Sequence, residues 1–176
     1  MNENKELLDA LIASIGMEEA GREFYLKAAK RSKNEFGKKI FEGLADDETR
    51  HVAAIKEYCE TIQKKGKTPN LCAAMPRHKT IKERLIFGRR ESELIKRVRP
   101  DAGELAAYTI AMDMENNGYN FYKKTLGAIK DPNAKDLYKF LLGEEEMHHD
   151  ILLSTYEYLK NPATWFVKEE KPIVEG

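Results

Sequence analysis

The chain has 176 residues, of which 34% are charged and 41% are hydrophobic. Basic and acidic residues both number 30, so the formal net charge is zero and gives no support to nucleic-acid binding. No apolar run is long enough to cross a bilayer and no signal-peptide pattern is present, so we expect a cytoplasmic protein without membrane contact.

Apolar positions and helix-ending residues predict four long helices in a single domain, residues 1–176. Ser32-Lys33-Asn34-Glu35 has the pattern of a capping box and begins the second helix, which ends before Gly66. Asp131-Pro132 is typical of a helix start and opens the fourth. The short connections make helices one and two, and helices three and four, antiparallel hairpins. The helices are expected at about residues 5–31, 33–65, 101–127 and 132–160.

A long connection, residues 66–100, separates the two hairpins. It is long enough to return along the bundle and to deliver the third helix parallel to the second, which is the single-crossover topology of ferritin-like folds. Within it, residues 80–98 are expected to form a short amphipathic helix. Residues 161–176 are expected to form a tail.

A pattern of acidic residues and histidine occurs twice along the chain. A lone glutamate on one helix is followed, on the next, by a Glu-x-x-His segment. The lone glutamates are 97 residues apart (18 and 115) and the Glu-x-x-His segments 98 apart (48 and 146). Residues three apart share a helix face, so the two ligands of each segment point the same way. The predicted metal ligands are Glu18, Glu48, His51, Glu115, Glu146 and His149.

These residues replace leucine on the apolar stripes of the predicted helices. The second helix has Leu44, Glu48, His51 and Ile55 in a row, and the fourth has Leu142, Glu146, His149 and Leu153. Buried charges are normally paired or bound to metal, so the six residues indicate a centre for two metal ions.

The roles within this centre follow from the positions of the ligands. We expect Glu18 and Glu115 to anchor one metal each, and Glu48 and Glu146 to bridge the two ions. His148, about 100° around the helix from its neighbour, is expected on the outer face or beside the ligands, and not as a ligand itself. A single Glu-x-x-His is more often a surface ion pair, and only the second copy reverses that interpretation.

The same motifs resemble the rubrerythrin branch of the ferritin-like superfamily. Each copy has the glutamate, then Phe-Tyr six and seven residues later, then Asp/Glu-Glu-x-x-His, and the match covers residues 7–159. The resemblance implies an all-α ferritin-like four-helix bundle holding two iron ions, which reduces hydrogen peroxide or dioxygen as a defence against oxidants. Tyr25 and Tyr122 are interpreted as core residues or as neighbours of the ligands.

Two departures from the family pattern bear on the activity. Rubrerythrins proper carry a rubredoxin module with four cysteines, whereas this sequence has only Cys59 and Cys72. We therefore expect a separate, rubredoxin-like electron donor. Rubrerythrins proper also carry a further carboxylate three residues after the third-helix ligand, where this chain has Gly118, matched by Gly21 in the first copy. These glycines either leave room for a small oxidant or allow close helix packing.

One segment of the chain is a candidate docking site for the electron donor. Residues 79–99 contain eight basic and three acidic side chains, which indicates either a docking patch for an acidic donor or a solvated helix face. We expect a homodimer or a higher oligomer.

Three alternatives to a peroxide-reducing enzyme stay open at this point. The chain could be a ferroxidase or iron-handling protein, a manganese catalase-like enzyme, or a bundle that uses metal only as a structural staple. Carboxylate and imidazole ligands suit iron but also accept manganese or zinc.

Overall fold

The computed structural model describes residues 3–65, 68–69, 102–162 and 165, and in these residues all regular structure is helical. The four long helices are α1 (Glu3–Arg31), α2 (Glu35–Lys65), α5 (Ala102–Ala128) and α6 (Pro132–Lys160). Their ends lie within two residues of the predicted ones, so the all-α four-helix prediction is confirmed. The short helix predicted at residues 80–98 and the tail beyond residue 165 lie outside the described residues.

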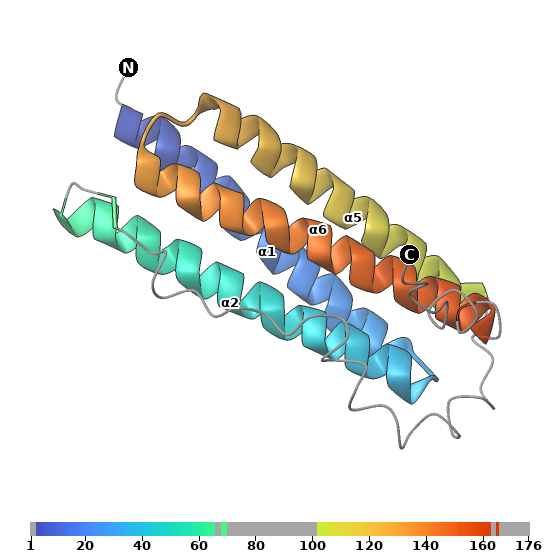
Figure 1. Cartoon of the computed structure of the whole chain (residues 1–176). Coiled ribbons are helices and arrows are strands. Elements are labelled where there is room, and N and C mark those ends of the chain that lie inside the picture. Colours follow the sequence, from blue (N-terminus) through green and yellow to red (C-terminus); the bar gives the residue numbers. More distant parts are fainter. Residues whose placement is uncertain (1–2, 66–67, 70–101, 163–164, 166–176) are drawn as a thin grey trace, which may run out of the picture.

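The helices form a bundle of two antiparallel hairpins (Figure 1). α1 packs on α2, α5 packs on α6, and the hairpins meet where α1 contacts α5 and α2 contacts α6. α2 and α5 run in the same direction, as predicted for two hairpins joined by a long connection. No helix in the described part of the chain is both long and apolar enough to span a membrane.

Local side chains explain where the second and fourth helices begin. Asn34, rather than Ser32, caps α2, because its Oδ1 accepts hydrogen bonds from the backbone N–H groups of Phe36 and Gly37 at 2.9 and 3.2 Å. Ser32 instead donates its hydroxyl to Glu104 at the start of α5. The capping-box prediction at Ser32 is therefore wrong, although the helix begins where it was expected.

The prediction for the start of α6 is confirmed. Asp131 lies just before the helix, and its Oδ1 accepts from the backbone N–H of Ala134 at 2.8 Å. Pro132 takes the first helical position, where no hydrogen bond from a backbone N–H is needed. Thr68, beyond the end of α2, donates to the other oxygen of Asp131 at 2.8 Å and so joins the two helix ends.

Apolar side chains gather in two clusters, one toward each end of the bundle. The first joins the C-terminal half of α1 and the N-terminal half of α2 to the first half of α5 and the end of α6, around Phe41, Leu44 and Tyr108. The second joins the opposite ends of the same helices, around Leu11, Ile55 and Leu141. Between them all four helices carry buried ionisable side chains.

Candidate metal centre

The middle layer of the bundle contains six buried acidic and histidine side chains that face one another. α1 and α5 supply one glutamate each, and α2 and α6 each supply a glutamate and a histidine three residues apart. All are less than 9% exposed. These residues are Glu18, Glu48, His51, Glu115, Glu145 and His148.

The prediction for α6 is wrong by one residue. Glu146 is exposed, and the side chain of His149 is 29% exposed beside Asp150. Glu145 and His148, which are 6% and 0% exposed, occupy the interior positions instead. His148 was expected on the outer face or beside the ligands, and it instead occupies the interior position itself.

The sequence explains why Glu146 and His149 were chosen, and it also contains the information that corrects the choice. Residues 144–149 read Glu-Glu-Glu-Met-His-His, so two Glu-x-x-His segments overlap there. Only the segment Glu145–His148 keeps the 97-residue spacing that relates Glu18 to Glu115 and Glu48 to Glu145. The same spacing pairs Leu44 with Leu141, which is fully buried. A constant offset applied to the whole motif finds the correct pair.

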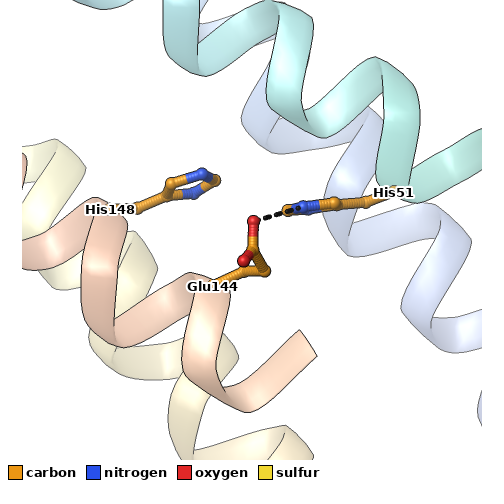
Figure 2. Close-up of side chains that lie close together, drawn as sticks. All are labelled: His51, Glu144 and His148. Atoms are coloured by element: carbon orange, nitrogen blue, oxygen red, sulfur yellow. Dashed lines mark hydrogen bonds and ion pairs between the residues drawn. The ribbon is translucent and has the colours of Figure 1, made fainter. Parts of the chain in front are cut away.

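The two histidines enter the layer from α2 and α6 and lie nearly parallel, with ring centroids 5.5 Å apart (Figure 2). Nδ1 of each ring faces the carboxylates. In His51 it lies 3.0 Å from Glu18 and 3.5 Å from Glu48. In His148 it lies 3.4 Å from Glu48 and 3.5 Å from Glu115. Glu48 therefore lies between the two halves, in the place expected of a bridging ligand.

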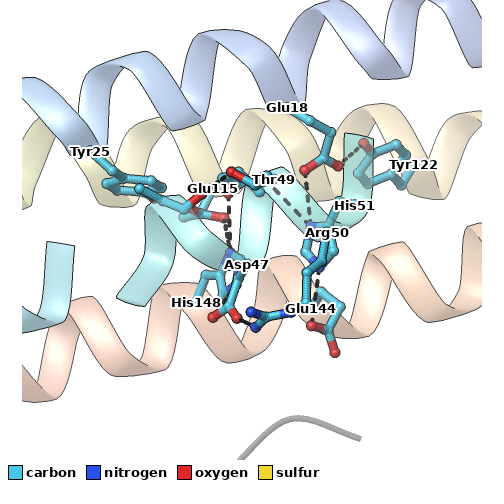
Figure 3. Close-up of polar contacts among 12 residues, drawn as sticks. Glu18, Tyr25, Asp47, Thr49, Arg50, His51, Glu115, Tyr122, Glu144 and His148 are labelled. Atoms are coloured by element: carbon cyan, nitrogen blue, oxygen red, sulfur yellow. Dashed lines mark hydrogen bonds and ion pairs between the residues drawn. The ribbon is translucent and has the colours of Figure 1, made fainter. Parts of the chain in front are cut away.

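A tyrosine from the opposite hairpin holds each of the single glutamates (Figure 3). Tyr122 on α5 donates its hydroxyl to Glu18 on α1, and Tyr25 on α1 donates to Glu115 on α5. Both tyrosines are fully buried. Tyr25 and Tyr122 are therefore core residues and also neighbours of the predicted ligands, so the two predicted alternatives apply together.

Two further carboxylates, which the sequence analysis did not assign, support the outer nitrogens of the histidines. Nε2 of His51 lies 3.2 Å from Glu144 on α6, and Nε2 of His148 lies 3.5 Å from Asp47 on α2. Each acid directly precedes the motif glutamate of its own helix, so the first letter of Asp/Glu-Glu-x-x-His could have identified it. A carboxylate on the outer nitrogen fixes the orientation of an imidazole ligand.

Comparison with known proteins places this geometry in a family. The family model described as Rubrerythrin matches residues 9–156. The chain belongs to the rubrerythrin family. Among curated proteins there is no match.

Solved structures support the fold of this rubrerythrin-family chain. A hypothetical protein from Pyrococcus furiosus is similar with a TM-score of 0.61 at 24% identity, over 88% of this chain and 90% of that one. A two-domain protein from Anabaena variabilis, with DJ-1/ThiJ/PfpI-like and ferritin-like domains, gives a TM-score of 0.65 at 14% identity, over 90% of this chain and 41% of that one. The predicted ferritin-like bundle is thus confirmed.

The electrostatics of the layer are those of a crowded acidic site. Burial and the charge of Glu48 raise the pKa of Glu18 from 4.5 to about 8. Burial and Glu115 raise the pKa of Glu145 to about 12. Burial opposes ionisation of Glu48 as well, but the polar side chains of Glu18, His148 and His51 beside it outweigh burial and lower the pKa of that carboxyl. Without a cation, the four motif glutamates therefore do not all ionise at neutral pH.

The donor set fits two divalent cations. Four ionised glutamates carry four negative charges, which two divalent ions neutralise, and the histidines then stay neutral as ligands. Two groups of three side chains have ligand atoms within 4.8 Å of one another and share Glu48: one contains Glu18 and His51, the other Glu115 and His148. Oε2 of Glu115 and both ring nitrogens of His148 are buried and face charged groups at 3.4–3.5 Å, which is too long for a well-formed hydrogen bond. Buried donors and acceptors of this kind are what a metal would satisfy.

A cavity of about 230 Å³ between α1 and α5 leads to the carboxylates of this layer. Glu18, Glu48, Glu115 and Glu145 all line it. Its lining also contains Gly21 and Gly118, where any side chain would project toward the acids. A Cβ on Gly118 would lie 2.4 Å from Oε2 of Glu145, and one on Gly21 would lie 3.5 Å from Glu48. Both glycines line the cavity and allow the carboxylates to pack close to the helix backbone, whereas a role in admitting a small oxidant stays a prediction.

Proposed function

We propose that this rubrerythrin-family chain binds two iron ions in the middle layer and reduces hydrogen peroxide, or dioxygen, with electrons from a separate protein. The observation that carries the proposal is the buried set of four glutamates and two histidines, arranged as two equivalent halves around Glu48. Carboxylate and imidazole donors suit iron, although manganese and zinc accept the same ligands.

In this proposal Glu18 with His51 holds one ion, and Glu115 with His148 holds the other. Glu48, which faces both histidines, and Glu145 would serve both ions. When bound, a pair of ferrous ions supplies two electrons, the number that converts one hydrogen peroxide and two protons into two water molecules. The tyrosine hydroxyls on Glu18 and Glu115 keep those carboxylates oriented while the charge of the site changes.

The cavity supports a small oxidant as substrate. Its lining includes Met17 and Met114, which are half-buried and occupy equivalent positions in the two halves, and beyond them lie the carboxylates. Hydrogen peroxide is small enough for such a space. The absence of a side chain at Gly21 and Gly118 keeps open the approach to the acids.

Rapid mixing of the diferrous protein with each oxidant tests the proposal. Protein purified anaerobically and loaded with two ferrous ions per chain is expected to be oxidised within one turnover by one equivalent of peroxide. Glu145→Ala should abolish the reaction, and Glu146→Ala, the exposed neighbour, should leave it intact. Slow oxidation by both peroxide and dioxygen would instead support a structural metal site.

Iron oxidation is the second candidate, because the same cavity offers ferrous ions a path lined by carboxylates. A ferroxidase oxidises iron as substrate, so added ferrous iron beyond two ions per chain would be consumed continuously and stored or released. The stoichiometry of iron oxidised per chain separates the candidates. A value that stays at two supports a resident di-iron centre.

A separate electron donor is part of the proposal, and residues 1–176 contain two cysteines. Its proposed docking segment, residues 79–99, lies outside the described residues and has an excess of five basic side chains. Salt and charge reversal at Arg89 and Arg90 should slow reduction by an acidic rubredoxin-like protein while leaving peroxide oxidation unchanged. Reduction rates that ignore both would refute docking there and leave the metal centre standing.

Self-association is also proposed. Large apolar side chains are exposed on α1 and α5, among them Ile12, Leu26 and Ile110. A second copy that covered some of these side chains would remove them from water. Sedimentation of the protein at micromolar concentration distinguishes a dimer from a monomer, and charged substitutions at Ile12 and Ile110 should convert the dimer to a monomer.

A further inference from the structure

The methionines of the bundle lie in two kinds of surroundings. Four of the six belong to the part of the chain that the structure describes, and all four are half-buried. Met112 and Met147 pack against the apolar cluster that contains Phe41. Met17 and Met114 instead line the cavity of about 230 Å³ between α1 and α5. Exposure therefore does not distinguish the two pairs, whereas contact with the cavity does.

The two cavity methionines occupy the same place in the two copies of the motif. Each directly precedes the single glutamate of its helix, and positions 17 and 114 are 97 residues apart. Consecutive residues on a helix point about 100° apart, so each methionine lies beside its glutamate rather than behind it. The glutamates are buried and the methionines half-buried, which places a thioether from each copy at the edge of the layer.

The cavity wall contains one kind of side chain that reacts directly with peroxide. Apart from the two methionines, the wall consists of four carboxylates, one amide, two glycines and one alanine. A thioether accepts an oxygen atom from an oxidant and becomes a sulfoxide, whereas carboxylate, amide and aliphatic groups do not undergo this reaction. An oxidant in this cavity therefore meets two reactive sulfur atoms even when no metal is bound.

We propose that Met17 and Met114 form a second site of reaction with hydrogen peroxide, one that needs no metal. In each reaction the sulfur forms a bond to one peroxide oxygen as the O–O bond breaks. The sulfur loses two electrons, the hydrogen on the transferred oxygen passes to the other oxygen, and that oxygen leaves as water. One chain consumes two peroxide molecules in this way.

This site goes beyond the proposed function, because it depends on the cavity and on neither iron nor an electron donor. A sulfoxide is polar and chiral where the thioether was apolar, and the change persists until a sulfoxide reductase removes the oxygen. The two methionines are therefore a renewable reserve for peroxide that enters the cavity while the layer holds no metal.

Peptide mapping of the metal-free protein after treatment with hydrogen peroxide tests the proposal. A chelator is present throughout, so that iron-driven radical chemistry does not contribute. Oxygen addition at each methionine is followed in time by mass spectrometry, and fragmentation separates Met112 from Met114, which share a tryptic peptide. Met17 and Met114 should be oxidised several-fold faster than Met112 and Met147. Methionine sulfoxide reductase should then remove both oxygen atoms, which places them on sulfur.

Two pairs of leucine substitutions identify the thioethers that react. Leucine has nearly the volume of methionine and no sulfur, so the double variant Met17→Leu and Met114→Leu should fold and lose the rapid uptake of two oxygen atoms. The matched control, Met112→Leu and Met147→Leu, should retain that uptake. Circular dichroism and thermal unfolding check that both variants are folded.

Unfolding the unmodified protein tests whether the cavity causes the preference. In denaturant the cavity no longer exists, so the four methionines should react at similar rates. A preference for Met17 and Met114 that persists in denaturant would overturn the inference, because it would arise from the local sequence. Equal rates in the folded protein, or faster reaction at Met112 and Met147, would overturn it as well.

The outcomes separate this inference from the proposed function. No metal enters the peroxide experiment, so a failure there leaves the metal centre intact. Conversely, a protein that binds no iron but oxidises the two cavity methionines first would contradict the proposed function and support this inference.

Discussion

The middle layer of the bundle and its two ends obey opposite physical rules. The ends are apolar clusters in which each large buried side chain contributes about 1.5–3 kcal/mol to the stability of the fold. The middle layer buries acidic groups whose ionised forms are costly without a cation. The ends can therefore hold the bundle together, whereas the middle layer opposes folding until its charges are neutralised.

The largest effect should come from ligands of the middle layer. With metal at a thousandfold excess over its Kd, binding should stabilise the protein by about 4 kcal/mol per site. Glu48→Ala and Glu145→Ala should remove most of this gain, because each deletes a buried carboxylate that lines the site. Thermal unfolding with and without ferrous or manganous ion measures it.

The neighbouring residues on α6 provide matched controls for this prediction. Glu146→Ala and His149→Ala change side chains of the same kind that lie outside the layer, so both variants should keep the full gain. If these variants lost the gain while Glu145→Ala kept it, the assignment of Glu145 and His148 to the centre would be wrong.

A leucine in an end cluster should behave in the opposite way. Leu44 is fully buried one turn before Glu48, so Leu44→Ala should cost about 3 kcal/mol through lost burial and a cavity. The loss should be equal in the metal-free and metal-bound proteins, because the cluster contributes no ligand. Denaturant unfolding of both forms provides the measurement, and a loss confined to the metal-bound form would contradict the division between layer and ends.

The stability of the metal-free protein should fall as pH rises from about 5 to 8. The pKa of Glu18 is raised from 4.5 to about 8, so its contribution is complete below pH 4.5 and is lost as pH approaches 8. The pKa values of both buried histidines are raised well above 6.5, since the nearby glutamates outweigh burial, and they act in the same direction. Metal releases these protons, so the metal-dependent rise in Tm should be larger at pH 8 than at pH 5.5.

Glu18→Gln sharpens the pH prediction because it removes one titrating group and keeps the size of the side chain. The variant should show a shallower decline of metal-free stability between pH 5 and 8. If the Tm of the metal-free protein is constant or increases over that interval, the ionisable groups of the middle layer do not control the pH dependence of stability.

The smallest effects are expected at the two glycines. Alanine is favoured over glycine within a helix by about 1 kcal/mol, and at Gly21 the added Cβ meets Glu48 at an ordinary distance of 3.5 Å. Gly21→Ala should therefore be neutral or stabilising. At Gly118 the Cβ would lie 2.4 Å from Glu145, so Gly118→Ala should displace that carboxylate and weaken metal binding. Equal metal affinities in the two variants would argue against a fixed place for Glu145.

Much of the fold was predictable because helix signals and apolar spacing agree along most of the chain. Asp131-Pro132 fixed one helix start, and the paired stripes placed Glu18, Glu48, His51 and Glu115 in the interior, where the structure has them. The residues between the hairpins carry a weaker pattern, and the short helix predicted there lies outside the described residues.

The remainder of the site depended on side-chain direction, which the Glu-x-x-His spacing does not specify by itself, although the constant 97-residue offset between the two copies does. Two adjacent faces of α6 offer the same Glu-x-x-His spacing, and one residue of rotation separates Glu145 from Glu146. The motif letter before each Glu-x-x-His marks Asp47 and Glu144 as candidates, but the packing of α2 against α6 decides their role, because each contacts a histidine of the other helix. The role of Asn34 likewise depended on Ser32 having another partner in Glu104.

The 97-residue correspondence of the hairpins has an evolutionary consequence. A single hairpin paired with a second copy of itself would present the same two sets of donors. In a homodimer every substitution occurs twice, and the two metal positions cannot diverge. A single chain is free of that restriction, and its two copies already differ, with Arg50 on one helix where Met147 lies on the other.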